Sequence, residues 1–104
     1  MAIDRLAMLE RFVAERPQDP FPHYGLAMEY RKRGRLEEAR AAFEALLERH
    51  PGYVPAYLMA GNALVEAGDR GAAAAVYERG IAAASAAGDD HALSELQSAR
   101  ALLG

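Results

Sequence analysis

The sequence contains no cysteine and no tryptophan. Without cysteine the chain can form no disulfide, offers no thiolate nucleophile and has no sulfur ligand for a metal. No segment approaches the roughly 20 consecutive apolar residues that a membrane-spanning helix needs, and the first residues lack the apolar core of a signal peptide. Alternating runs of β-branched residues are also missing, so no strand is predicted. We therefore expect an all-α, cytoplasmic protein that does not enter a membrane.

What the sequence does contain is typical of one globular domain. Its 104 residues are 52% hydrophobic and 26% charged, with a net charge of −3. This composition argues against disorder. A chain of this length can bury a continuous core but leaves no room for a second one. We expect a single domain over residues 1–104.

The chain resembles itself at an interval of 34 residues. Shifting the sequence by this interval pairs most positions with residues of similar type. The paired positions are Pro17 and Pro51, Leu26 and Ala60, Ala27 and Gly61, Tyr30 and Leu64, Gly34 and Gly68, Ala39 and Ala73, and Phe43 and Tyr77. A fixed period of this length indicates stacked helical hairpins, each of which buries its apolar face against its neighbours.

Apolar residues at helical spacing predict about six helices. We place the first over residues 3–16, with Asp4 in its first turn, and the second from about residue 20 to the basic run at 31–33. The others cover residues 36–49, 54–67, 70–87 and 89–103. Gly34 is expected to end the second helix in a left-handed conformation, and Asp69 to cap the fifth. Gly71 and Gly80 weaken the fifth helix unless they permit close packing.

The repeated positions can be laid on a known signature, W-x2-L-G-x2-Y followed by A-x3-F and P. The first copy falls on His23, Leu26, Ala27, Tyr30, Ala39, Phe43 and Pro51, and the second on Tyr57, Ala60, Gly61, Leu64, Ala73, Tyr77 and Ser85. The chain thus resembles the tetratricopeptide repeat (TPR) family, although a histidine replaces the tryptophan and a serine the last proline. The resemblance implies an α-α superhelix of antiparallel hairpins: a half-repeat helix at 3–16, repeats at 20–53 and 54–87, and a capping helix at 89–103.

In proteins of this resemblance the first helix of each repeat lines a concave face that holds a segment of a partner. The resemblance therefore implies a small non-enzymatic adaptor or scaffold that binds another protein and needs no cofactor. The implied peptide-binding positions are Phe21, Tyr24, Met28, Arg31, Lys32, Leu58, Asn62 and Val65, with Glu66 beside them. The alternative for Tyr24, Met28 and Leu58 is that they only cover the core.

Two further features bear on the partner. Some family members hold an acidic C-terminus with lysine, arginine and asparagine residues. The corresponding positions of this chain are Tyr24, Met28, Met59, Asp89 and Leu93. This set contains no cation, so we expect an apolar peptide or helix instead. Self-association through the groove or the array ends, which would make a homo-oligomer, is the alternative.

Other candidate sites have simpler interpretations. His23, His50 and His91 have no ligand-type spacing, so a metal site is not expected. The Asp89-Asp90 pair suits a helix cap better than acid–base chemistry. The basic run 31–35 is best explained as a solvated helix end and not as a nucleic-acid site. No phosphate loop, nucleophile elbow or other catalytic constellation is present.

Overall fold

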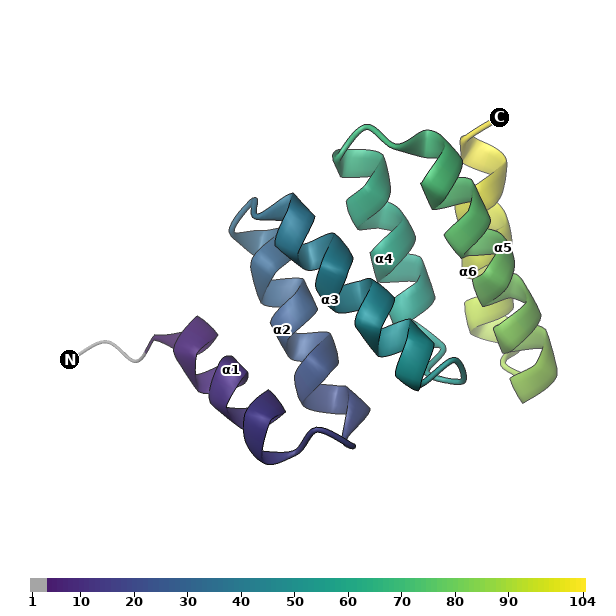
Figure 1. The fold of residues 1–104 in the computed structure, drawn as a ribbon. Helices are drawn as coiled ribbons and strands as arrows, with labels where there is room; N and C mark the ends of the chain where they lie inside the picture. Colours follow the sequence, from purple (N-terminus) through teal and green to yellow (C-terminus); the bar gives the residue numbers. More distant parts are fainter. Residues whose placement is uncertain (1–3) are drawn as a thin grey trace.

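The computed structural model describes residues 4–104, which form an elongated, all-α stack of helices (Figure 1). The helices are α1 (Arg5–Glu15), α2 (Pro20–Lys32), α3 (Leu36–Arg49), α4 (Pro55–Glu66), α5 (Arg70–Ala87) and α6 (Asp90–Leu102). Each packs against the next in the sequence, and α4 also contacts α2 and α6. The domain measures 45 × 28 × 21 Å. The predicted α-α repeat architecture is confirmed, and the stack is open at both ends.

The helix ends follow from local chemistry. Asp19, Asp69 and Asp89 precede α2, α5 and α6, and each carboxylate accepts a hydrogen bond from a backbone N–H in the first turn. Asp4 does the same for α1, so it is the N-cap; placing it inside the first turn was wrong by one position. Such side chains satisfy N–H groups that have no partner within the helix. Ile3, expected in the first helix, lies outside the described residues.

Positions one period apart occupy similar places in the two hairpins α2–α3 and α4–α5. Ala39 and Ala73 are fully buried, and Phe43 and Tyr77 are each only 2% exposed. Tyr30 departs from this pattern, because it is half-buried whereas Leu64 is buried. The guanidinium of Arg35 lies over the Tyr30 ring at 5.0 Å. Since only α1 precedes the first hairpin, Tyr30 lies nearer to solvent than its counterpart.

Gly80 marks a close contact between the middle and the end of the stack. A β-carbon at this position would lie 2.5 Å from the Cβ atom of Tyr57 in α4 and 2.9 Å from a methyl carbon of Leu96 in α6. Both distances are too short for real atoms, so α4 and α6 approach α5 this closely only because Gly80 has no side chain. The expectation that a glycine here permits close packing is confirmed. Gly71, by contrast, is exposed and has no such neighbour.

Within residues 4–104, no helix combines the length and hydrophobicity required to cross a bilayer.

Candidate functional site

Three adjoining hollows run along the side of the stack where α2, α4 and α6 meet. Their volumes are about 300, 400 and 370 Å³. The first and second hollows share Leu58, His91 and Glu95. The second and third share Asn62, Ala99 and Leu102. We call the three together the trough. Volumes of a few hundred Å³ are typical of sites that accept large side chains or small ligands.

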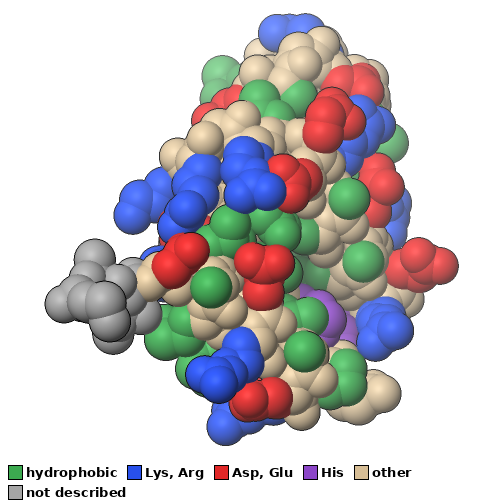
Figure 2. Space-filling view, turned by 60° about the vertical axis from the view of Figure 1, so that its left-hand side comes forward, with side chains coloured by type: hydrophobic (Ala, Val, Ile, Leu, Met, Phe, Trp, Pro, Cys, Tyr) green, Lys and Arg blue, Asp and Glu red, His purple; other side chains and the backbone are tan. Residues whose placement is uncertain are grey.

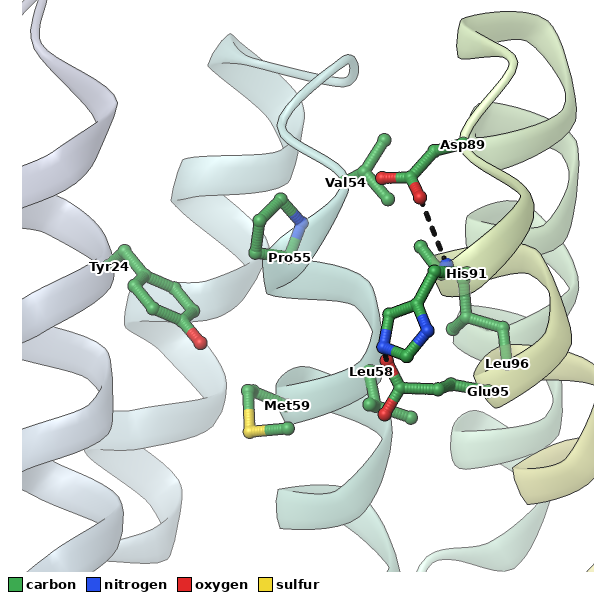
Figure 3. A pocket seen from close by; sticks show the side chains of 10 residues that line it. Tyr24, Val54, Pro55, Leu58, Met59, Asp89, His91, Glu95 and Leu96 are labelled. Atoms are coloured by element: carbon green, nitrogen blue, oxygen red, sulfur yellow. Dashed lines mark hydrogen bonds and ion pairs between the residues drawn. The ribbon is translucent and has the colours of Figure 1, made fainter.

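The first hollow has an apolar floor and a polar rim (Figure 3). Tyr24 of α2 forms one wall, Leu58 and Met59 of α4 lie between, and α6 forms the opposite wall. Tyr24 is fixed by aromatic neighbours, because its ring centre lies 6.5 Å from that of Phe43 and 5.6 Å from that of Tyr53. Burial is the main cause that raises the pKa of the Tyr24 hydroxyl, so this group stays neutral and can donate a hydrogen bond.

The rim of the first hollow belongs to α6. Asp89 caps this helix through a hydrogen bond of 3.0 Å from the backbone N–H of Ala92. His91 and Glu95 lie one turn apart, with Nε2 of the imidazole 3.1 Å from Oε1 of the carboxylate (Figure 3). All three side chains are exposed at the edge of the hollow.

The third hollow is more polar, and its side chains are already bonded to one another. The guanidinium of Arg31 reaches from α2 to α4, where Nε lies 2.5 Å from Oε1 of Glu66 and Nη1 lies 3.5 Å from the sulfur of Met59. The Tyr77 hydroxyl donates a hydrogen bond of 2.5 Å to Oδ1 of Asn62. The amide nitrogen of Asn62 is therefore the group that can serve a ligand here. These bonds connect α2 to α4 and α4 to α5, and they hold the floor of the trough in place.

The structure places most, but not all, of the residues expected in a groove along this trough. Tyr24, Arg31, Leu58, Asn62 and Val65 line it, and Glu66 does so too. Phe21, Met28 and Lys32 are not among its lining residues. Phe21 is 69% exposed and Lys32 is exposed, whereas Met28 is half-buried against the core. The burial of the Met28 side chain therefore agrees with the alternative that this residue covers the core.

Sequence reasoning missed most of the contribution of α6, because residues 89–103 were interpreted as a cap and only Asp89 and Leu93 among them were considered as positions facing a partner. The residues of α6 that line the trough are His91, Ser94, Glu95, Leu96, Ser98, Ala99 and Leu102, with Ala92 beside them. A signal was present: one more step of 34 residues beyond Tyr57 falls on His91. The same step beyond Leu58 falls on Ala92, which lines the first hollow.

Comparison with known proteins agrees with the stacked helical hairpins. The model of the tetratricopeptide repeat family matches residues 30–103. The chain belongs to the TPR family. A curated TPR repeat-containing protein of Pseudomonas aeruginosa is 30% identical over 88 residues, covering 85% of this chain and 84% of the relative. TPR domains generally mediate protein–protein interactions, and TPR proteins are generally non-enzymatic scaffolds.

Solved structures show the same arrangement of helices. A TPR domain protein from Salinibacter ruber, solved in solution, is 37% identical with a TM-score of 0.79 and covers 84% of this chain and 88% of its own. A protein from Bordetella parapertussis, also solved in solution, is 27% identical with a TM-score of 0.83 and covers 98% of this chain and 89% of its own. The TPR fold is thus present along nearly all of the chain.

The basic run of this TPR domain is largely neutralised by carboxylates. Arg33 donates to Glu29 at 2.9 Å and to Asp4 at 3.3 Å, and Arg35 pairs with Glu38 at 2.6 Å. Arg31 is paired with Glu66, as described above. Figure 2 shows basic side chains lying beside acidic ones over this side of the molecule. Because the positive charges are paired in this way, the run offers little attraction for a phosphate backbone.

His23 and Asp89 each have a structural role at the start of a helix. Nε2 of His23 lies 3.0 Å from the carbonyl oxygen of Pro17, which joins the start of α2 to the preceding turn. The interpretation of Asp89 as a helix cap is confirmed. No group of three or more histidine and acidic side chains in residues 4–104 is placed to hold a metal ion.

Proposed function

We propose that this TPR domain is an adaptor that binds a segment of a partner protein along the trough. The observation that carries the proposal is a series of three adjoining hollows along the inner helices α2, α4 and α6, the first of which has an apolar floor and polar groups on its rim. This combination is typical of binding sites, in which apolar contacts supply affinity and a few polar groups fix orientation. Within this proposal α1 is a half repeat, α2–α3 and α4–α5 are the two full repeats, and α6 is both a cap and a wall of the site.

The rigidity of the floor supports this use of the trough. Tyr24 is held by two aromatic neighbours, and Arg31 ties α2 to Met59 and Glu66 of α4. A preorganised surface loses little conformational entropy on binding, so more of the contact energy appears as affinity. Leu102 is 85% exposed and Val65 is 37% exposed beside the same trough, so both have apolar surface that a partner can cover.

A steric block of the trough tests the proposal. Ser98 is exposed on α6 and lines the second hollow, the largest of the three at about 400 Å³, so Ser98→Phe places a ring in the binding path without disturbing the core. Ser85→Phe, at an exposed position of α5 outside the three hollows, is the matched control. The probe is a set of synthetic peptides selected from a random library on the unmodified domain, titrated by fluorescence anisotropy.

We expect Ser98→Phe to weaken binding about tenfold or more. The peptide can then no longer bury an apolar side chain in the blocked hollow, and that burial contributes about 1.5 kcal/mol or more to the binding free energy. Ser85→Phe should leave the affinity unchanged. Backbone amide shifts on peptide addition should appear in α2, α4 and α6. Equal binding by both variants, or amide shifts confined to α3 and α5, would contradict the proposal.

A further inference from the structure

We infer that the segment bound in the trough carries a lysine or arginine side chain beside an apolar one, and that this basic side chain occupies the first hollow. The inference rests on the proposed use of the trough and adds the chemistry of the partner. Three features of the first hollow support it: its apolar lining, the aromatic ring at one wall, and the sign of the charges on its rim.

The first hollow matches the two parts of a long basic side chain. The aliphatic stem of lysine or arginine packs on apolar groups while its charged head stays near water. Leu58, Met59 and Leu96 supply the apolar lining, and Tyr24 presents an aromatic ring on the opposite wall. A cation near an aromatic ring is attracted by the negative face of the ring. The carboxylates of Asp89 and Glu95 lie at the mouth, on the side of α6 (Figure 3).

The charged side chains that line this hollow are carboxylates. Its ionisable lining residues are Tyr24, Asp89, His91 and Glu95, which include no lysine or arginine. With histidine counted as neutral at pH 7, the two carboxylates leave the mouth negative. Asp90 is exposed next to Asp89 and adds a third carboxylate nearby.

The neighbouring cation does not reverse this sign. Arg31 of α2 lies beside the first hollow, with Nη1 3.5 Å from the sulfur of Met59, but its charge is paired with Glu66 at 2.5 Å. Arg70, the other basic residue of the third hollow, donates to the carbonyl oxygen of Leu103 at 2.6 Å. An acidic side chain placed in the first hollow would therefore meet two carboxylates and no free cation. A basic side chain has complementary charge there, and complementarity of this kind governs partner choice and association rate.

The test combines a charge change in the protein with one in the peptide. Asp89→Asn plus Glu95→Gln removes both rim charges, and asparagine preserves the cap of α6 because it is as good an N-cap as aspartate. Glu37→Gln plus Glu48→Gln removes the same charge from exposed positions of α3 and is the matched control. Random peptides are selected on the unmodified domain, and the best binder is also made with its basic residue replaced by glutamine. Circular dichroism melts verify that each variant is folded.

We expect the selected peptides to share a lysine or arginine next to an apolar residue. The Asp89→Asn, Glu95→Gln variant should bind the basic peptide about fivefold more weakly, the size expected for two partly exposed ion pairs. It should bind the glutamine peptide as the unmodified domain does, and added salt should remove the difference. The Glu37→Gln, Glu48→Gln variant should behave as the unmodified domain.

Two different failures are distinguishable. If the selected peptides are acidic or uncharged, or if the rim variant binds the basic peptide unchanged, the inference about the partner is wrong while the trough remains a binding site. If no peptide is selected, or if Ser98→Phe does not affect the selected ones, the proposed function itself fails and this inference with it.

Discussion

Gly61 of α4 faces the ring of Tyr77 on α5 so closely that a β-carbon at position 61 would overlap ring atoms of the tyrosine. The two residues come from the first and second helices of one hairpin, and Tyr77 is only 2% exposed. The same ring is fixed at its other end by the hydrogen bond from its hydroxyl to Asn62. The tyrosine therefore cannot move away from the glycine without losing a buried contact.

Alanine should destabilise the domain at the two crowded glycines, Gly61 and Gly80, and stabilise it at the uncrowded Gly71. Gly61→Ala and Gly80→Ala should each destabilise the domain by about 1 to 3 kcal/mol, because the added methyl group overlaps buried side chains. Gly71→Ala is the control: nothing crowds this position, and alanine should stabilise α5 by about 0.5 kcal/mol. Urea unfolding followed by circular dichroism measures all three. A stabilised Gly61→Ala would show that α4 and α5 are farther apart than described.

Truncation of Phe43 tests the assignment of the core with the largest expected loss of stability. Its side chain is 2% exposed and contacts the ring of Tyr24 edge-on. Phe43→Ala should lower the free energy of unfolding by about 3 to 5 kcal/mol, since it removes a buried ring and leaves a cavity. Leu102→Ala, at a position that is 85% exposed, should change it by less than about 0.5 kcal/mol. Similar values for the two variants in urea unfolding would contradict the assignment of the core.

The ion pairs of Glu29 lead to a prediction of how the stability of the domain depends on pH. This carboxylate accepts from Arg33 at 2.9 Å and lies 3.2 Å from Arg5 of α1, so it joins α1 to α2. The hydrogen bond from Arg33 is the main cause that lowers the pKa of Glu29 below its ordinary value of 4.5. Its stabilising contribution is thus complete above pH 4.5 and is lost as the pH falls through the lower pKa of the folded state.

Glu29→Gln should therefore be less stable than the unmodified domain at pH 7, and the difference should shrink below pH 4.5. Thermal melts from pH 7 down to pH 3 measure this, with Glu48→Gln, at an exposed position, as the control that should follow the unmodified domain. A constant difference at all pH values would mean that the charge of Glu29 does not stabilise the packing of α1.

The two ends of the stack predict the oligomeric state. The outer side chains of α1 include Arg11 and Glu15, which are 76% and 59% exposed and pair with each other. Exposed residues of α6 outside the three hollows include Asp90 and Gln97. Polar end faces of this kind stop an array from stacking on further copies. We expect light scattering to give a monomer of 11.2 kDa across a concentration series. A dimer that grows with concentration would support self-association instead.

The helices and their stacking could be predicted because they depend on local spacing. Gly34 and Gly68, one period apart, both have positive φ angles, of 75° and 83°. Most helix ends agree with the prediction within a residue, since prolines, glycines and capping aspartates mark them locally.

The site was harder to predict, because it depends on which side chains meet across helices. Arg31 was expected to face a ligand, yet its guanidinium is bound to Glu66 and Met59. Met59 and Glu66, which lie 28 and 35 residues from Arg31 in the sequence, hold its side chain in the floor of the trough. Contacts over such distances cannot be read from local spacing. His91 and Glu95 were overlooked because residues 89–103 were interpreted mainly as a cap, although one more step of 34 residues from Tyr57 reaches His91.

The positive φ angles of Gly34 and Gly68 give the two hairpins the same reversal of chain direction. The segment from residue 35 to residue 68 is consequently an interchangeable module, which begins just after one such glycine and ends on the next. A tandem copy of it would enter the chain at matching turns and lengthen the trough by one inner helix. The reach of this domain along a ligand would thus grow with the number of such modules in the chain.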